Sequence, residues 1–435
     1  MKLREIGVRA ACHLGAAVTA AALTAATAGA APNAGTGPPG GSSTTTTAPF
    51  TTPNTDDCPQ RTRTPAAIDS SEVPAPGEPT PTDLPVPAPP IGGQRLGECG
   101  VVLPVGAPPP PADISATAWL VADLDTGRVL AAKDPHGRYR PASTIKVALA
   151  IVALRTLDLD EVVTGTQADA DVEGTRAGIG PGGRYTNHQL MQALIMSSGN
   201  DAAHAIATQL GGDKAAVAQM NAVAETLRAM DTRAATPSGL DGPGMTTSAY
   251  DLSVLFREAM SIPLFAELIH TEQVDFPGYP ADPKIPGDED RPGFPIGNDN
   301  QLLYNYPGAI GGKTGFTDDA RQTFVAAAER DGHRLVVSLL QADVRPIRPW
   351  EQAARLLDYG FALDADARIG KLPESGSAAI EPSVLLATPP PRAGDTRAAA
   401  EQSPHQGARV ATLIGGPILL VVLLLGVRRM RRRGR

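Results

Sequence analysis

The chain has 435 residues, of which 42% are hydrophobic, 19% are charged and only 4% are aromatic. Its 45 glycines and 42 prolines follow no three-residue period, which excludes a collagen-like protein and indicates that part of the chain lies outside a packed domain. The formal net charge of −8 argues against a protein that binds nucleic acid.

The N-terminus is typical of a secretory signal peptide. Three basic residues within the first nine positions precede an uncharged, alanine-rich run that reaches the small residues Ala28-Gly29-Ala30. We therefore expect residues 1–30 to be removed from an exported protein.

The next segment, residues 31–112, is rich in proline, glycine, serine and threonine, which predicts a flexible or polyproline-like stalk. Cys12 lies in the signal segment, so Cys58 and Cys99 remain after processing. In an oxidising compartment these two are expected to form a disulfide that closes a small element within the stalk. The cysteines and scattered histidines lack metal-ligand spacing, so we expect neither a metal nor another cofactor.

Residues 113–371 form the segment that is long and apolar enough to make a sizeable globular domain. Strands are predicted over 117–123, 128–132, 323–328 and 335–340, and helices over 141–157, 186–196, 201–210 and 350–359. Strands at both ends with helices between them predict an α+β fold, in which one antiparallel sheet is flanked by helices and has a helical subdomain beside it.

The C-terminal part of the chain carries the features of a membrane anchor. Residues 372–409 are again proline-rich and are expected to be a disordered tether. Residues 410–427 carry no charge and have about the minimum length for a transmembrane helix. The arginines of the tail, 428–435, place that end in the cytoplasm by the positive-inside rule. We therefore expect a single-pass protein in the cell membrane, with residues 113–371 on the extracytoplasmic side.

The first chemical motif is Ser143-Thr144-Ile145-Lys146, at the start of a predicted helix. Residues three apart share one helix face, so the amine of Lys146 is expected beside the hydroxyl of Ser143. A serine hydroxyl is a weak nucleophile until a base takes its proton, and a lysine becomes such a base when burial and nearby positive charge lower its pKa. Taken alone, the motif is more often a capping serine with a solvated lysine.

Two further motifs contain residues of the same chemistry. Ser198-Gly199-Asn200 falls between two predicted helices, where a loop can place a hydroxyl and an amide over a pocket. Gly311-Gly312-Lys313-Thr314-Gly315 falls on a predicted strand, where glycines allow a ligand to approach closely and Lys313 and Thr314 offer a cation and a hydroxyl to a carboxylate. Alone, either motif is also typical of an ordinary turn or a glycine-rich edge strand.

The order and context of the three motifs resemble those of the serine acyl-transferases that include penicillin-binding proteins and β-lactamases. The closer resemblance is to the D-alanyl-D-alanine carboxypeptidases of the S11 peptidase family, the low-molecular-weight penicillin-binding proteins. It covers about residues 113–365 and implies the β-lactamase/DD-peptidase-like fold. It rests on PASTIK (141–146), SGNDAA (198–203), TPSGLDG (236–242), TTSAYD (246–251) and GKTGFT (312–317).

The resemblance implies a serine peptidase mechanism. Ser143 would attack the carbonyl between two D-alanines and form an acyl-enzyme, and Lys146 would accept its proton. Ser198 would pass a proton to the leaving D-alanine, and Asn200 would help to hold the substrate. Water would then release the shortened peptide.

The resemblance also implies how the ligand is held. Lys313, Thr314 and Gly315 would bind the terminal carboxylate, and the backbone N–H groups of Ser143 and Phe316 would form the oxyanion hole. The expected partners are a peptidoglycan stem peptide that ends in D-Ala-D-Ala and β-lactam inhibitors that mimic it. No nucleic acid is expected, and the membrane is contacted through the C-terminal helix.

Two alternatives are weaker. A class A-like β-lactamase would carry Glu-x-x-Leu-Asn between Asn200 and Lys313, where this chain has Glu225-Thr226-Leu227-Arg228. A catalytically inactive wall-binding scaffold would suit the proline-rich segments and the disulfide, but it would not need the six motif residues that the chain retains.

Overall fold

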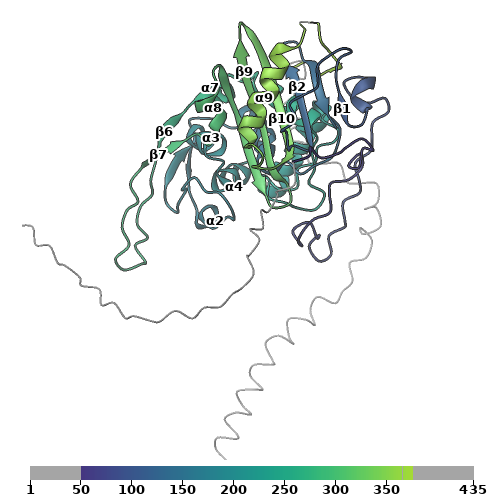
Figure 1. The fold of residues 1–435 in the computed structure, drawn as a ribbon. Helices are drawn as coiled ribbons and strands as arrows, with labels where there is room; N and C mark the ends of the chain where they lie inside the picture. The colour runs from purple at the N-terminus through teal and green to yellow at the C-terminus, as the bar shows by residue number, and fades with distance from the viewer. Residues whose placement is uncertain (1–49, 365, 376–435) are drawn as a thin grey trace, which may run out of the picture. The chain divides into compact units, whose positions relative to one another are not determined.

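The computed structural model describes residues 50–364 and 366–375 (Figure 1). The predicted signal peptide, transmembrane helix and basic tail lie outside these residues, as does most of the predicted tether. In the part of the chain that is described, no helix is both long and apolar enough to cross a membrane.

An antiparallel sheet forms the centre of the described residues, and the predicted α+β architecture is confirmed. Its strands lie in the order β1 (Val101–Val102), β3 (Arg128–Lys133), β2 (Ala118–Asp123), β10 (His333–Ala342), β9 (Arg321–Arg330) and β8 (Ala309–Thr317), with β11 (Gly370–Lys371) also paired with β3. The two ends of the domain meet where β2 pairs with β10, from Leu335 opposite Asp123 to Leu340 opposite Ala118.

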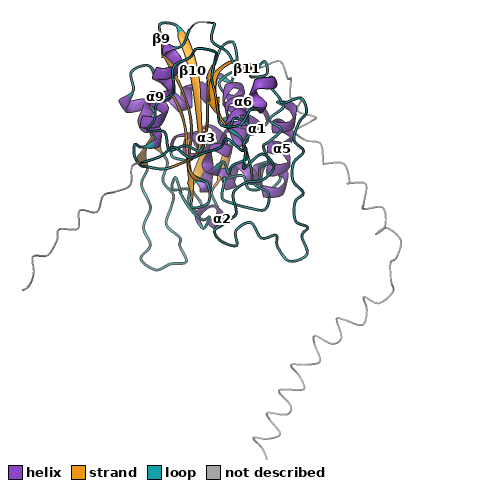
Figure 2. Ribbon diagram, turned by 45° about the vertical axis from the view of Figure 1, so that its right-hand side comes forward, coloured by secondary structure: helices purple, strands orange, loops and turns teal. Residues whose placement is uncertain are grey.

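Helices cover both faces of this sheet (Figure 2). The amphipathic helix α9 (Pro349–Ala362) packs against β9 and β10 on one face, and α6 (Ala249–Ala259) packs against β2 and β10 on the other. All six residues of β2 are buried, as expected for a strand with a helical layer on each side. The core is therefore divided into two layers by the sheet.

A helical region lies beside the sheet, and its caps follow the sequence prediction. Thr186 accepts a hydrogen bond from the backbone N–H of Gln189, whose side chain in turn accepts from Thr186, so a capping box begins α3 (Asn187–Met196). The other elements of this region are α1 (Lys146–Thr156), β4 (Val162–Thr164), α2 (Gln167–Ala170), β5 (Arg184–Thr186), α4 (Asn200–Gln209), α5 (Asp213–Thr226), α7 (Pro263–His270), β6 (Gln273–Phe276), β7 (Phe294–Gly297) and α8 (Gln301–Asn305).

Residues 50–112, which we call the strap, belong to the segment for which the sequence predicted a flexible or polyproline-like stalk. They pack against the domain, and within them Leu96 of the short helix η1 (Gln94–Gly97) is fully buried. Buried Arg138 donates hydrogen bonds to the strap carbonyls of Thr62 (2.9 Å), Leu84 (2.7 Å) and Pro85 (2.9 Å). Proline removes backbone donors but leaves every carbonyl, so a proline-rich segment can be held by donors that another part of the chain supplies.

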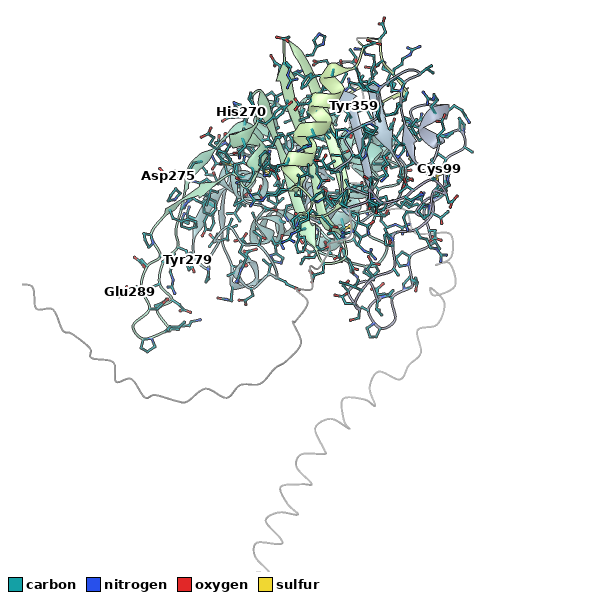
Figure 3. The ribbon with its side chains drawn as sticks, in the orientation of Figure 1. Cys99, His270, Asp275, Tyr279, Glu289 and Tyr359 are labelled. Carbon is teal, nitrogen blue, oxygen red and sulfur yellow. A yellow bond between two sulfur atoms is a disulfide. The ribbon has the colours of Figure 1, made fainter. Side chains whose placement is uncertain are left out.

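The predicted Cys58–Cys99 disulfide is confirmed, and it closes the strap on itself. Cys99, labelled in Figure 3, is followed by β1, which adds an edge strand to the sheet beside β3. The strap is thus joined to the domain by a strand, by the hydrogen bonds of Arg138 and by an ion pair between Arg140 and Glu72. A composition that cannot build its own core still supports packing onto a core that exists.

Candidate active site

The segment that leads to Ser143 is held against the sheet. The predicted helix over 141–157 begins as a 3₁₀ turn, η2 (Ala142–Ile145), because Ala142 has a φ of +47° and cannot start a regular α-helix. Thr323 of β9 donates a hydrogen bond to the carbonyl of Pro141 at 2.7 Å. Gly315 of β8 lies so close that a Cβ there would be 2.9 Å from the backbone nitrogen of Ser143, so only glycine fits.

Ser143 and Lys146 are brought together as their spacing predicts. The amine of Lys146 lies 2.8 Å from Ser143 Oγ, and it also bonds Asn200 Oδ1 at 2.7 Å and the carbonyl of Ser238 at 2.6 Å. Lys146 is fully buried at the N-terminus of α1. The lysine is thus held by three oxygen atoms, none of which belongs to a carboxylate.

Burial lowers the pKa of Lys146 well below its ordinary value, and the nearby charge of Lys313 lowers it further. The carboxylates of Asp299 and Asp201 oppose this shift without cancelling it. A lysine in such a site can be neutral near physiological pH, and its free lone pair can then accept the proton of Ser143. The pair has the chemistry of a nucleophile with its general base.

The loop between α3 and α4 places Ser198 and Asn200 beside this pair. Ser198 has a φ of +59°, and its hydroxyl accepts a hydrogen bond from Lys313 at 2.9 Å. Asn200 turns its amide oxygen to Lys146 because its Nδ2 donates to the carbonyl of Glu173 at 2.7 Å. One amide therefore links Lys146 to the loop around Glu173.

Lys313 and Thr314 lie on β8, as predicted. Lys313 is fully buried, and burial lowers its pKa although the carboxylate of Asp299 opposes the shift. Its amine donates to the carbonyl of Thr314 at 2.9 Å, and Thr314 Oγ1 donates to Asp299 Oδ2 at 2.7 Å. The strand thus presents a buried cation and a hydroxyl at the rim of the site.

Phe316 lies further along the same strand and is 57% exposed. The six motif residues that the sequence singled out form two hydrogen-bonded groups, one of Ser143, Lys146 and Asn200 and the other of Ser198, Lys313 and Thr314. The two groups are close enough for the charge of Lys313 to lower the pKa of Lys146.

Sequence reasoning assigned no role to three residues that complete this set. The carbonyl of Ser238 accepts from Lys146, the carbonyl of Glu173 orients Asn200, and Asp299 contacts Thr314 and Lys313. The stretch around Ser238 belongs to TPSGLDG (236–242), one of the stretches singled out in the sequence. Its glycine is required, because Gly239 has a φ of +89° and a Cβ there would lie 2.1 Å from the carbonyl oxygen of Ala142. No motif marks Glu173 or Asp299, whose partners come from distant segments.

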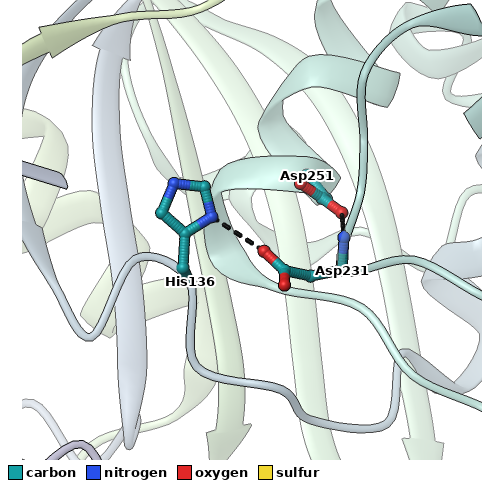
Figure 4. Close-up of side chains that lie close together, drawn as sticks. All are labelled: His136, Asp231 and Asp251. Atoms are coloured by element: carbon teal, nitrogen blue, oxygen red, sulfur yellow. Dashed lines mark hydrogen bonds and ion pairs between the residues drawn. The ribbon is translucent and has the colours of Figure 1, made fainter. Parts of the chain in front are cut away.

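His136, Asp231 and Asp251 lie close enough together to resemble metal ligands (Figure 4). Each ring nitrogen of His136 already has a partner, Asp231 Oδ2 at 2.7 Å and the strap carbonyl of Ile91 at 3.0 Å. Arg138 also donates to Asp231, and the Asp231 backbone N–H donates to Asp251. Each member of the group therefore serves to hold the strap or the loop beneath it.

Fold and site together define a serine peptidase with the DD-peptidase fold. The family model described as D-alanyl-D-alanine carboxypeptidase, Peptidase S11, matches residues 105–344. The chain belongs to this family, and it is a serine-type D-Ala-D-Ala carboxypeptidase.

Individual relatives agree with this assignment. The chain is 48% identical over 275 residues to the D-alanyl-D-alanine carboxypeptidase DacB2 of Mycobacterium tuberculosis, which is 62% of this chain and 90% of that protein. It is 33% identical over 265 residues to DacD of Escherichia coli, which is 58% of this chain and 64% of that protein.

Solved structures show the same fold. The crystal structure of a D-alanyl-D-alanine carboxypeptidase from Mycobacterium tuberculosis matches with a TM-score of 0.58 at 47% identity, covering 62% of this chain and all of that one. The Streptomyces K15 DD-transpeptidase matches with a TM-score of 0.54 at 28% identity, covering 59% of this chain and all of that one. These matches favour the carboxypeptidase over the β-lactamase and scaffold alternatives.

Proposed function

We propose that this chain is a membrane-anchored, extracytoplasmic carboxypeptidase that removes the terminal D-alanine from peptidoglycan stem peptides through an acyl-enzyme on Ser143. The observation that carries the proposal is the buried Lys146 amine, 2.8 Å from Ser143 Oγ and with a lowered pKa. By shortening stem peptides the enzyme trims cell-wall precursors and limits their cross-linking.

Acylation begins at Ser143. Neutral Lys146 takes the hydroxyl proton as Ser143 Oγ bonds the carbonyl carbon between the two D-alanines. The oxyanion is stabilised by the backbone N–H groups of Ser143 and Phe316. Ser198 then passes its proton to the leaving amine as the C–N bond breaks and receives in its place the proton that Lys146 had taken, so Lys146 is neutral again for the second half of the reaction. Water attacks the ester in the second half of the reaction and regenerates the hydroxyl.

The terminal carboxylate is assigned to β8. Lys313 provides the charge, Thr314 provides a hydroxyl, and Gly315 allows the substrate backbone to approach the strand. Asn200, fixed by Glu173, supports the general base, and it is also assigned to help hold the substrate. A β-lactam presents a reactive amide and a carboxylate to the same groups, and it is expected to acylate Ser143 as well.

The location of the enzyme is proposed from the ends of the sequence. The signal-like residues 1–30 and the uncharged residues 410–427 followed by arginines support export and a single membrane anchor. The disulfide of the strap agrees with an oxidising compartment.

The test is the intact mass of residues 31–408 after incubation with excess penicillin, together with D-alanine release from a peptide that ends in D-Ala-D-Ala. We expect a lasting adduct and D-alanine release, with both lost in Ser143→Ala. Lys146→Met should lower the acylation rate by about 10³-fold or more while the melting temperature is kept, because it removes the base and a buried amine. Hydrolysed penicillin without D-alanine release would instead indicate a β-lactamase.

A further inference from the structure

Asp299 lies beside Thr314 and Lys313, the residues assigned to the terminal carboxylate, and no motif includes it. It stands between β7 and α8, and its backbone N–H donates to the carbonyl of Met196 at 2.9 Å, which ties it to the loop that carries Ser198. Its side chain is 34% exposed. The carboxylate therefore has a fixed position and remains open to a bound ligand.

The contacts of Asp299 are the groups assigned to the substrate carboxylate. Its Oδ2 accepts the hydrogen bond of Thr314 Oγ1 at 2.7 Å and lies 3.9 Å from the amine of Lys313. A threonine hydroxyl has a single proton to donate. The amine of Lys313 already donates to Ser198 Oγ and to the Thr314 carbonyl. The free site thus already places a negative charge against its own carboxylate-binding groups.

We propose that Asp299 is a specificity-determining residue that discriminates against a negative charge on the leaving group. A terminal carboxylate must share Thr314 and Lys313 with Asp299, and the two like charges repel each other. A terminal carboxamide avoids this repulsion, because its oxygen can accept from Lys313 while its N–H donates to Asp299. The inference rests on the proposed function, since it concerns the same bound peptide.

Asp299 also affects the pKa of Lys146 and of Lys313, so its replacement should change the pH profile of activity as well. Its carboxylate raises the pKa of Lys146 and of Lys313 against the larger effect of burial. The other charges that act on Lys146 are Lys313, which lowers its pKa, and Asp201, which raises it. Activity needs Lys146 without its proton and Lys313 with it. Removing the charge of Asp299 should therefore move both limbs of the pH profile to lower pH.

The experiment compares two substrates that differ only in the terminal group: an N-acetylated peptide that ends in D-Ala-D-Ala and the same peptide ending in D-Ala-D-alaninamide. In Asp299→Asn, measured at its own pH optimum, kcat/KM for the free acid should rise about tenfold through KM. The amide should change by less than about threefold, because partial exposure screens the repulsion and only the acid experiences it. Asp299→Ser, which also lacks the charge, should shift the ratio in the same direction.

The matched control is Asp275→Asn, the same substitution at an exposed residue of β6 (Figure 3), which should leave the ratio of acid to amide unchanged. Equal changes for both peptides, or a fall for the free acid in folded Asp299→Asn and Asp299→Ser, would overturn the inference while wild-type activity upholds the proposed function. If the wild type cleaves neither peptide and penicillin leaves no adduct on Ser143, the proposed function fails, and this inference fails with it.

Discussion

Buried cations hold both the catalytic centre and the strap, but their partners differ. Lys146 and Lys313 bond hydroxyl, amide and carbonyl oxygens, and both have a lowered pKa. Arg138 and Arg140 of the adjoining segment contact the carboxylates of Asp231 and Glu72. Although burial opposes it, the hydrogen bond and charge of Glu72 raise the pKa of Arg140.

This difference separates reactivity from support. Lys146 has no carboxylate in direct contact and can give up its proton, as its proposed role of general base requires, whereas the amine of Lys313 lies 3.9 Å from Asp299 Oδ2. A buried arginine keeps its charge under any ordinary condition and is well suited to holding carbonyls and carboxylates in place. In the same fold, therefore, the buried lysines of the catalytic centre are not paired with a carboxylate at hydrogen-bond distance, whereas the buried arginines under the strap are.

The strongest way to test the supporting role of the strap is to remove its disulfide. Replacing Cys58 and Cys99 with serine should lower the free energy of unfolding by about 3–4 kcal/mol, because the 41-residue separation is no longer closed in the unfolded chain. Denaturant unfolding measures this loss. D-alanine release at low temperature should stay within about twofold of the wild type.

The distinction between a supporting strap and a reactive centre would be wrong if the disulfide variant kept its stability or lost activity while still folded. The second result would mean that the strap positions Ser143 through Arg138 and Arg140 rather than only stabilising the domain. Wild-type protein treated with reductant under the same conditions serves as an independent check.

A smaller effect is expected from the carboxylates beneath the strap, and it depends on pH. Burial raises the pKa of Asp251 to about 8, and the neighbouring Asp231 adds to the shift. A group whose pKa is raised on folding stabilises the protein at low pH, and this contribution is lost as the pH rises through the folded value. Between pH 6 and 9 the ionisation of Asp251 should lower the free energy of unfolding of the wild type by roughly 2–3 kcal/mol.

His136 acts in the same direction, because its hydrogen bond to Asp231 raises its pKa although burial opposes the shift. Asp251→Asn mimics the protonated carboxyl and should flatten most of this slope while changing the melting temperature at pH 6 little. Thermal melts of both proteins across pH 6–9 measure the difference. Parallel slopes would show that Asp251 is already ionised in the folded protein at pH 6.

The smallest effect is expected at an exposed contact of the strap. Lys214 pairs with Glu78 at 3.3 Å, with their side chains 97% and 58% exposed. Solvent and salt screen such a pair, so Lys214→Ala should change the free energy of unfolding by less than about 0.5 kcal/mol. A loss above 1 kcal/mol in denaturant unfolding would mean that surface pairs also hold the strap.

Local patterns predicted much of the catalytic domain. Apolar runs and turn signals located β2, β3, β9, β10 and α9, and Thr186 located the start of α3. The motif residues were found because the spacing from Ser143 to Lys146 brings two groups together on a single turn. That Ser198 and Lys313 belong to the same site was expected only from the resemblance to a family, since those residues lie on other elements.

The strap shows where such reasoning failed. Its composition correctly indicated a segment without a core of its own, but the groups that hold it, such as Arg138 and Arg140, lie beyond it in the sequence. Each looks like an ordinary surface charge until the chain is folded. The same holds for Asp299, which gains its meaning only when β8 brings Lys313 and Thr314 to it.

The sequence by itself predicted that Ser143 and Lys146 lie side by side, which elements carry them and which cysteines pair, because these follow from spacing along a helix, hydrophobic periodicity and the cysteine count. The tertiary structure alone decided that the strap is bound, that Ser238 and Glu173 orient the lysine and the amide, and that the carboxylate of Asp299 contacts Thr314 on β8. The physical reason is that burial and charge pairing depend on contacts between segments far apart in the sequence, which local sequence patterns do not predict.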